Sequence, residues 1–120
     1  MKFTIIVNNA PYQSQSSDTA CKFAHALLEE GHDLVQVFFY FDGVWNALDN
    51  AEPPQDDRHV IENWSELAQK NDLDLIICST AAKRRGVRLS TIAPGFIINT
   101  LGRLSEAITL SDRVITFGGS

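Results

Sequence analysis

Cysteine is scarce in this sequence, and its spacing argues against two common structural uses. The 120 residues contain two cysteines, Cys21 and Cys78, which form no CxxC pair and lie near no cluster of histidines. Zinc sites and disulfide frameworks need more numerous or more closely spaced cysteines. We therefore expect both thiols to be reduced, with no metal bound to them.

Long hydrophobic runs and an excess of positive charge are also absent. No stretch approaches the roughly 18 consecutive apolar residues of a membrane span. The N-terminus MKFTIIVNNA lacks the apolar span and the cleavage site of a signal peptide. The net charge of -5 opposes general nucleic-acid binding, which depends on excess lysine and arginine. These features predict a cytoplasmic protein with no membrane segment and no direct nucleic-acid partner.

The glycines do not form a phosphate-binding motif. Gly43, Gly86, Gly95 and Gly102 match neither the GxGxxG pattern nor a P-loop. No Ser/His/Asp arrangement can be recognised, and the carboxylates are too scattered to nominate an acid/base pair. Nucleotide binding and hydrolysis therefore have little support in the sequence.

Length and composition predict a single domain over residues 1–120. Apolar residues make up 44% of the chain and charged residues 21%, which is the balance of a globular protein. A chain of this length can bury one hydrophobic core and is too short for two ordinary domains.

Apolar residues alternate along the chain between short continuous runs and helical spacing. The short runs, rich in β-branched and aromatic residues, predict strands at residues 2–7, 34–41, 74–78 and 113–117. Helical spacing predicts helices at residues 14–30, 79–86 and 101–110, and after Asp56 and Asp57, either of which would cap the helix. We interpret residues 44–57 as a loop with one helical turn, and residues 87–99, interrupted by Pro94 and Gly95, as a loop.

Strands separated by helices indicate right-handed crossovers and a mostly parallel sheet covered on both faces. The predicted fold class is therefore a small doubly wound α/β domain. In such folds ligands and reactive groups gather at the carboxyl ends of the strands. Asn8, the segment Phe41 to Gly43 and Cys78 lie at or just after the ends of predicted strands and are expected at that edge.

Cys78 is the candidate reactive residue. A helix starting after it would place the thiol beside unpaired backbone N–H groups, and Lys83, Arg84 and Arg85 would add positive charge. Both effects favour the thiolate, which is the nucleophilic form. The alternative is an inert thiol that ends a core strand, because cysteine is among the most buried residue types.

The other candidates have simpler structural explanations. Cys21 lies next to the apolar stripe of the first predicted helix and is expected to pack there. His25 and His32 have no second ligand at a useful spacing and are expected in surface or cap roles. His59 is expected in the first turn of a helix, unless its loop folds over the third strand and brings it to Cys78.

Three blocks of the sequence resemble one family. They are VFFYFDGV at residues 37–44, PPQDDRH at residues 53–59, and a cysteine followed by small residues and a basic stretch before glycine, CSTAAKRRG, at residues 78–86. Together they resemble the DsrE/TusD family of sulfur-relay subunits, and the similarity extends from Lys2 to Gly118. The resemblance implies a flavodoxin-like α/β fold of the DsrE type. It also implies one cysteine that carries sulfur as a persulfide, which matches Cys78.

The resemblance also implies partners. Members of this family assemble with related small subunits of the DsrF/TusC and DsrH/TusB types into a heterohexamer. They pass sulfur to a DsrC/TusE-like acceptor, either in sulfur oxidation or in tRNA 2-thiouridine synthesis, and use no cofactor. The PPQDDRH block leans toward sulfur oxidation. One departure is the segment RLSTIAPGFIINT at residues 88–100, which is shorter than the acidic segment typical of the family.

Three functions follow from these observations. The leading one is a sulfurtransferase subunit that acts through a Cys78 persulfide. The second is a non-catalytic structural subunit of the same kind of complex, with an ordinary thiol at Cys78. The third is a thiol redox sensor in which Cys78 oxidises to a sulfenic acid. The apolar stretches VFFYF and GFIIN are candidates for subunit contact.

Overall fold

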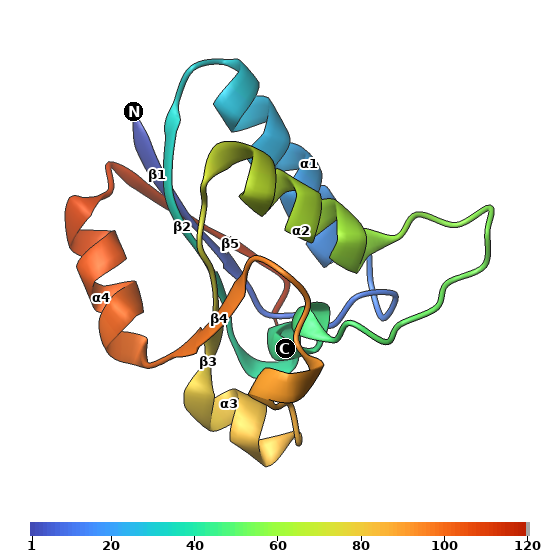
Figure 1. The fold of residues 1–120 in the computed structure, drawn as a ribbon. Coiled ribbons are helices and arrows are strands. Elements are labelled where there is room, and N and C mark those ends of the chain that lie inside the picture. The colour runs from blue at the N-terminus through green and yellow to red at the C-terminus, as the bar shows by residue number, and fades with distance from the viewer. Residues whose placement is uncertain (120) are drawn as a thin grey trace.

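The computed structural model describes residues 1–119 and shows one parallel sheet flanked by helices (Figure 1). Five strands pair in the order β4-β3-β2-β1-β5, and every pairing is parallel. The strands are β1 (Lys2–Val7), β2 (Asp33–Phe39), β3 (Leu75–Cys78), β4 (Phe96–Asn99) and β5 (Arg113–Phe117). The predicted doubly wound α/β fold is confirmed.

Helices cover both faces of this sheet. They are α1 (Ser16–Glu29), α2 (Val60–Asn71), α3 (Ser79–Arg84) and α4 (Leu101–Leu110), with the 3-10 helices η1 (Phe41–Ala47) and η2 (Leu89–Thr91). The ring of Phe3 packs edge-on against Phe23 of α1. The neighbouring Thr4 points to the opposite face, where its hydroxyl donates to the carbonyl of Ala107 in α4 at 3.5 Å.

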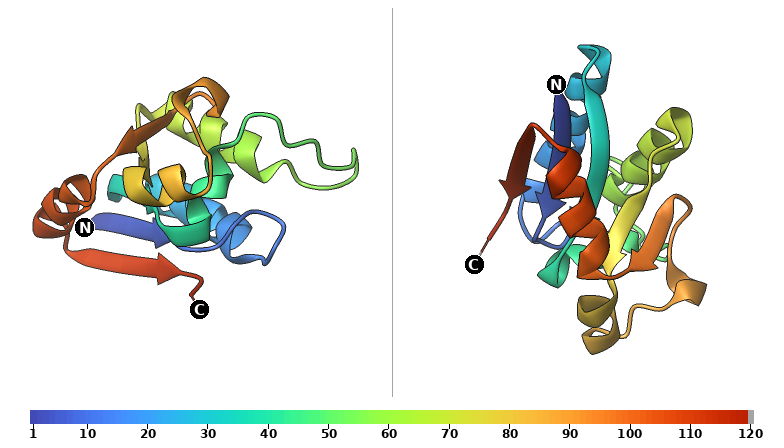
Figure 2. Two further views of the ribbon diagram at one scale, coloured as in Figure 1. Left: turned by 90° about the horizontal axis from the view of Figure 1, so that it is seen from below. Right: turned by 90° about the vertical axis from the view of Figure 1, so that its left-hand side faces the viewer.

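The short helices lie at the carboxyl ends of the strands. Figures 1 and 2 show α3 following directly from β3 at this end, with the 3-10 segments beside it. The loop between η1 and α2 projects away from the sheet in both figures. The carboxyl end of the sheet is therefore bounded by η1, α3 and η2, the elements that surround the end of β3.

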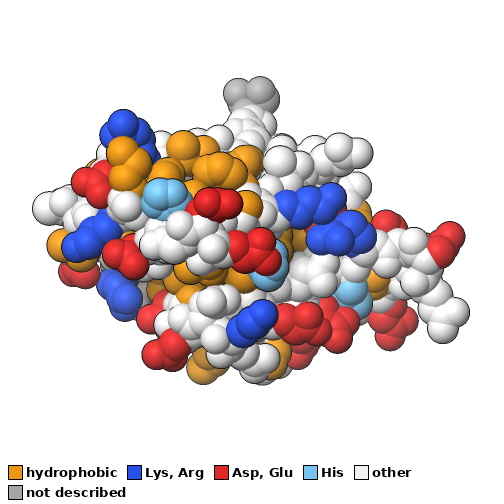
Figure 3. Space-filling view, turned by 90° about the horizontal axis from the view of Figure 1, so that it is seen from above, with side chains coloured by type: hydrophobic (Ala, Val, Ile, Leu, Met, Phe, Trp, Pro, Cys, Tyr) orange, Lys and Arg blue, Asp and Glu red, His pale blue; other side chains and the backbone are white. Residues whose placement is uncertain are grey.

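The surface at the opposite end of the molecule carries mixed charge. Seen from above, acidic and basic side chains are interspersed among hydrophobic ones (Figure 3). Within residues 1–119, no helix has both the length and the apolar character needed to cross a membrane.

Strand β4 corrects the interpretation of residues 87–99 as a loop. Phe96 to Asn99 pair in register with Leu75 to Cys78, so the sheet has a fifth strand beside β3. The four apolar and polar residues of β4 are too few to establish a period, and Pro94 and Gly95 directly before them suggested a turn. Gly95 does form that turn, with a φ of 92°, and its carbonyl accepts from the Leu75 N–H at 3.1 Å.

The start of α2 corrects the prediction that Asp56 or Asp57 caps this helix. The N-cap is His59, whose Nδ1 accepts from the N–H of Glu62 at 3.2 Å. Asp57 instead accepts from the N–H of Arg58 at 2.9 Å, inside a turn that precedes the helix. Because this turn precedes the helix in the sequence, the helix begins at Val60 rather than directly after Asp57.

A buried polar network joins elements that are distant in the sequence. The indole N–H of Trp64 in α2 donates to the Ser17 hydroxyl of α1 at 3.0 Å, and that hydroxyl donates to Oδ1 of Asn46 in η1 at 2.5 Å. The Asn46 amide group donates to the carbonyls of Asn9 and Gly43, both at 2.9 Å. Because Trp64, Ser17 and Asn46 are fully buried, each of these bonds satisfies a polar group that water does not reach.

We expect Asn46→Ala to destabilise the fold by about 2–3 kcal/mol, because it removes the donor to the Asn9 and Gly43 carbonyls and the acceptor of the Ser17 O–H. The free energy of unfolding in urea, measured by circular dichroism, tests this. Asn71→Ala is the matched control, since Asn71 is exposed and donates a single bond to the Leu67 carbonyl. Equal losses in the two variants would contradict the importance given to the buried network.

Candidate functional site

Cys78 is the last residue of β3 and the N-cap residue of α3. Its strand runs between β2 and β4, and Cys78 itself pairs with Asn99 of β4. Ile77 pairs with Phe39, and Phe39 packs on Trp64 of α2, so the Ile77 side chain lies on the face of the sheet that carries α2. Because side chains alternate between the two faces along a strand, the Cys78 side chain points toward the other face, which carries α4. The structure thus places the predicted reactive residue at the carboxyl edge of the sheet, as the sequence predicted.

The Cys78 side chain is buried, with 2% of its surface exposed. Ala81 and Ala82 of α3 are buried behind it, and Ile76 before it is fully buried. The thiol is free, and it does not form a disulfide with Cys21. A reagent or a partner protein can therefore reach the sulfur only if the surrounding elements move apart locally.

The segment opposite α3 is η1, which is held close to the end of β1. Gly43 lies so near the Val7 carbonyl that a Cβ at this position would sit 2.1 Å from its oxygen. Just before it, Phe41 has a φ of 48°, a conformation that side-chain-bearing residues seldom adopt. This turn stacks the rings of Tyr40 and Phe41 at 4.1 Å and leaves Phe41 53% exposed.

An ion pair connects η1 to α3. Arg85, the C-cap residue of α3, donates from Nε to Oδ1 of Asp42 at 2.8 Å and from Nη1 to the Ala81 carbonyl at 3.1 Å. Arg85 is half-buried, whereas Lys83 and Arg84 are exposed. Of the three consecutive cations that the sequence placed near Cys78, the structure turns Arg85 inward and neutralises it with Asp42.

We expect Asp42→Asn to expose Cys78 more often, because it removes the charge that holds α3 against η1. The rate of alkylation of Cys78 in the native protein, followed by peptide mass, should rise by about fivefold if opening of α3 limits access. Asp18→Asn is the control, since it breaks the ion pair of the same 2.8 Å length with Arg58 elsewhere in the structure. An unchanged Cys78 rate, or an equal rise in the control, would show that this ion pair does not limit access.

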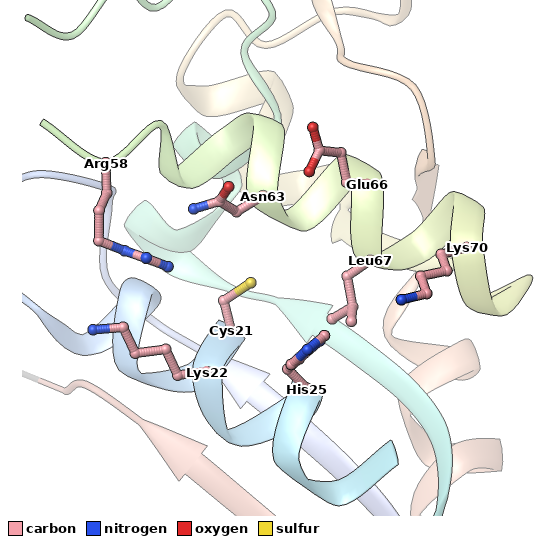
Figure 4. Close-up of a pocket in the computed structure, with 8 residues that line it drawn as sticks. All are labelled: Cys21, Lys22, His25, Arg58, Asn63, Glu66, Leu67 and Lys70. Atoms are coloured by element: carbon pink, nitrogen blue, oxygen red, sulfur yellow. The ribbon is translucent and has the colours of Figure 1, made fainter. Parts of the chain in front are cut away.

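Cys21 occupies a different place from Cys78. It lies on α1 at a cavity of about 420 Å³ between α1 and α2, where its sulfur points toward α2 (Figure 4). Burial raises the pKa of the Cys21 thiol to about 12, with a smaller contribution from Asp18, and Arg58 acts in the opposite direction. This thiol is protonated at neutral pH and is 5% exposed, as expected of the packing residue that the sequence predicted.

The raised pKa of Cys21 predicts a loss of stability at alkaline pH. In the unfolded chain this thiol ionises near a pKa of about 8.5, so above that pH the folded state binds one more proton than the unfolded state. The free energy of unfolding therefore falls by up to about 1.4 kcal/mol per pH unit until the folded pKa is reached. Urea unfolding of the wild type and Cys21→Ala at pH values of about 8 and about 10 should show a steeper fall in the wild type. An equal fall in the free energy of unfolding of the two proteins would contradict this prediction.

The histidines lie apart from Cys78. His59 caps α2, which covers the opposite face of the sheet from the Cys78 side chain, and its loop does not fold over β3. His25 pairs with Glu29 at 3.1 Å, and the ring of His32 packs edge-on against Phe3. Within residues 1–119, no three His, Cys, Asp or Glu side chains converge in a way that could hold a metal ion.

The sequence placed Cys78 and the segment Phe41 to Gly43 at this edge, but it did not show the contact between Asp42 and Arg85, and it missed Asn99. Asp42 and Asn99 both border the end of β3, one through its ion pair with α3 and the other through strand pairing. The signal for Asp42 was its place directly after a strand, where parallel sheets gather functional groups. No comparable signal marked Asn99, because its strand was not recognised.

Known proteins share this fold and much of this sequence. The family model described as DsrE/DsrF-like family matches residues 1–117. The DsrE protein of Allochromatium vinosum is 45% identical, with 98% of this chain and 99% of that protein covered. A protein of Vibrio vulnificus named as a homolog of sulfurtransferase TusD is 41% identical, with 98% of each chain covered.

Two solved structures are similar in shape. The YchN protein of E. coli has a TM-score of 0.87 at 28% identity, with 98% of this chain and 99% of that chain covered. MTH1491, a protein of unknown function from Methanobacterium thermoautotrophicum, has a TM-score of 0.76 at 12% identity, covering 95% and 97% of the two chains. The second likeness concerns the fold alone.

Proposed function

The chain belongs to the DsrE/DsrF-like family and is a sulfurtransferase, and we propose that it carries sulfur as a persulfide on Cys78. The resemblance to the DsrE/TusD family that the sequence indicated is confirmed. The persulfide and the identity of the carrier residue are our proposal. We also propose that residues 1–120 act as one domain, since the five strands form one sheet.

The observation that carries this proposal is the position of the two thiols. Cys78 lies at the carboxyl edge of the sheet, between η1 and α3, where parallel α/β folds gather reactive groups. Cys21 lies between α1 and α2, and burial keeps its pKa at about 12. Only a thiolate attacks sulfur readily, so Cys78 is the better candidate for the carrier.

The proposed reaction is two exchanges at sulfur. The Cys78 thiolate attacks the terminal sulfur of a donor persulfide; a new S–S bond forms to Cys78, the donor S–S bond breaks, and its electron pair leaves with the donor thiolate. The thiolate of an acceptor then attacks the same terminal sulfur, and Cys78 leaves as a thiolate. No oxidant or reductant is consumed, and the protein needs no cofactor for either step.

Burial of Cys78 suits a carrier. At 2% exposure, a persulfide formed there would be shielded from water and from free thiols between loading and delivery. Loading and delivery then both require a local opening of the kind that separates α3 from η1. Burial also slows access to the Cys78 sulfur, and a partner protein that binds at this end of the sheet would offset this effect.

The same burial supports a second candidate, a structural subunit that no longer transfers sulfur. The alignment with the A. vinosum protein spans 129 positions, although this chain has 120 residues, so that relative carries inserted residues. A chain that lacks such residues and buries its cysteine could contribute only its surface to a complex. A redox sensor has less support, because Cys21 lies at the cavity between α1 and α2, on the face of the sheet opposite to the one that Cys78 points toward, and is poorly placed as a resolving thiol.

We propose that the chain works with partner subunits. In this proposal it assembles with DsrF/TusC-like and DsrH/TusB-like subunits and delivers sulfur to a DsrC/TusE-like acceptor, in sulfur oxidation or in tRNA thiolation. The two free thiols are consistent with a reducing compartment, and we propose the cytoplasm. Of the stretches VFFYF and GFIIN, the second supplies the exposed residue Ile97, which remains our candidate for subunit contact.

The first test is sulfur loading followed by mass. Purified protein is incubated with cysteine persulfide, and the Cys78 peptide should gain one reducible sulfur atom. Cys78→Ser should fold but gain none, and Cys21→Ser should load like the wild type. Loading that persists in Cys78→Ser would refute the carrier role. Absence of loading in the wild type, with slow alkylation of Cys78, would favour the structural subunit.

A further inference from the structure

Positive charge is concentrated in one part of this acidic chain. The protein has a net charge of -5, with 15 acidic residues against 10 lysines and arginines. Between Leu75 and Ser105, however, there are five basic residues and no aspartate or glutamate. This segment includes β3, α3, η2 and β4, so these cations lie around the end of the sheet that carries Cys78. The fold adds two acidic residues there, Asp42, which pairs with Arg85, and Asp49, whose N–H donates to the Thr91 carbonyl of η2.

Three of these cations are exposed, two on α3 and one directly before η2. Lys83 and Arg84 project from α3, and Arg88 is the residue directly before η2. Because α3 has six residues, its length is about 9 Å, so Lys83 and Arg84 lie within about one Debye length of the end of β3 along the helix. Their charges therefore act on any molecule that approaches Cys78.

Within residues 1–119, these three cations form no ion pair, a property that they share with Lys2, Lys70 and Arg113 but not with the other cations of the chain. Lys22 and Arg58 both pair with Asp18, and Arg103 pairs with Glu106. In the part of the chain that the structure describes, no ion pair involves Lys83, Arg84 or Arg88, and Arg85 beside them is neutralised by Asp42. The opposite end of the molecule shows acidic and basic side chains side by side (Figure 3).

Two apolar side chains accompany the cations. Leu89 is 76% exposed and follows Arg88, and Phe41 is held beside α3 because its neighbour Asp42 bonds to Arg85. Large exposed apolar residues flanked by charge are typical of protein contact surfaces. We call the set formed by Phe41, Lys83, Arg84, Arg88 and Leu89 the basic patch.

We propose that the basic patch binds an acidic surface on the protein that exchanges sulfur with Cys78. The inference rests on the proposed carrier function. The partner protein would present carboxylates around its reacting thiol and an apolar contact for Phe41 and Leu89. A nucleic acid fits less well, because the net charge of -5 repels an extended polyanion and the apolar members would meet no counterpart.

The proposal has a kinetic consequence. Complementary charges speed the encounter of two proteins, and added salt screens the effect. Sulfur should therefore reach Cys78 faster from an acidic donor than from a neutral one, and the difference should shrink as salt rises. Transfer from a small donor with no acidic surface should not depend on the basic patch.

The test uses two peptide donors that differ only in charge. One is a peptide of about twelve residues with six glutamates around a cysteine persulfide, and the other has glutamines in their place. At low salt we expect the acidic peptide to load Cys78 about tenfold faster, and at high salt we expect the rates to converge. The triple variant Lys83→Gln, Arg84→Gln, Arg88→Gln should lose this preference.

A matched control removes the same charge elsewhere. The triple variant Lys2→Gln, Lys70→Gln, Arg113→Gln changes three exposed cations outside the basic patch and should keep the preference. Equal loss in both variants, or no preference in the wild type, would overturn the proposal. Stronger competition by a single-stranded RNA of equal charge than by the acidic peptide would replace it with nucleic-acid binding.

Failure of the basic-patch proposal can be distinguished from failure of the carrier proposal. If cysteine persulfide loads Cys78 but the peptides show no charge preference, only the basic-patch proposal fails. If nothing loads Cys78, the binding of a fluorescently labelled, persulfide-free acidic peptide is measured by anisotropy in the same three proteins. Weaker binding in the Lys83, Arg84, Arg88 variant alone would retain the basic patch as an interaction surface, whereas equal binding in all three would exclude it.

Discussion

The hydrogen bonds of Asn46 connect the core of this protein to the end of the sheet where the reactive residue lies. Through Ser17 and Trp64, Asn46 joins η1 to α1 and α2, and through the Asn9 carbonyl it joins η1 to the turn after β1. A hydrophobic contact at this position would allow η1 to slide, whereas directional bonds to buried groups fix one arrangement. The position of η1 is therefore determined by the interior of the domain rather than by its surface.

That fixed position extends to Cys78. Because η1 is immobilised, Asp42 at its start can hold Arg85, and Arg85 in turn holds the last turn of the short helix that follows Cys78. A six-residue helix has little stability of its own, so contacts to neighbouring elements decide how often it moves. A buried network thus anchors η1 to the interior, and a weaker, partly exposed ion pair connects η1 to the helix that follows the buried thiol.

The sequence predicted most of the fold and the candidate residue, and its failures have clear physical causes. Strands β1, β2, β3 and β5 were recognisable as short apolar runs, and the longer helices by their helical spacing. Strand β4 is as short as β3, but Pro94 and Gly95 directly before it indicated a turn, so only its pairing with β3 reveals it. The contact between Asp42 and Arg85 joins residues that are 43 positions apart, and no local pattern shows which of three adjacent cations turns inward.

The close approach of Gly43 to β1 restricts which substitutions this lineage of proteins can accept at that position during evolution. Any substitution there would place a carbon atom 2.1 Å from the Val7 oxygen, and η1 would have to move away from the sheet. A codon change at this one position would thus displace the partner of α3 without touching a reactive residue. The projecting loop at residues 49–58 is mostly exposed, and sequence drift can accumulate there while the geometry around Cys78 is inherited intact.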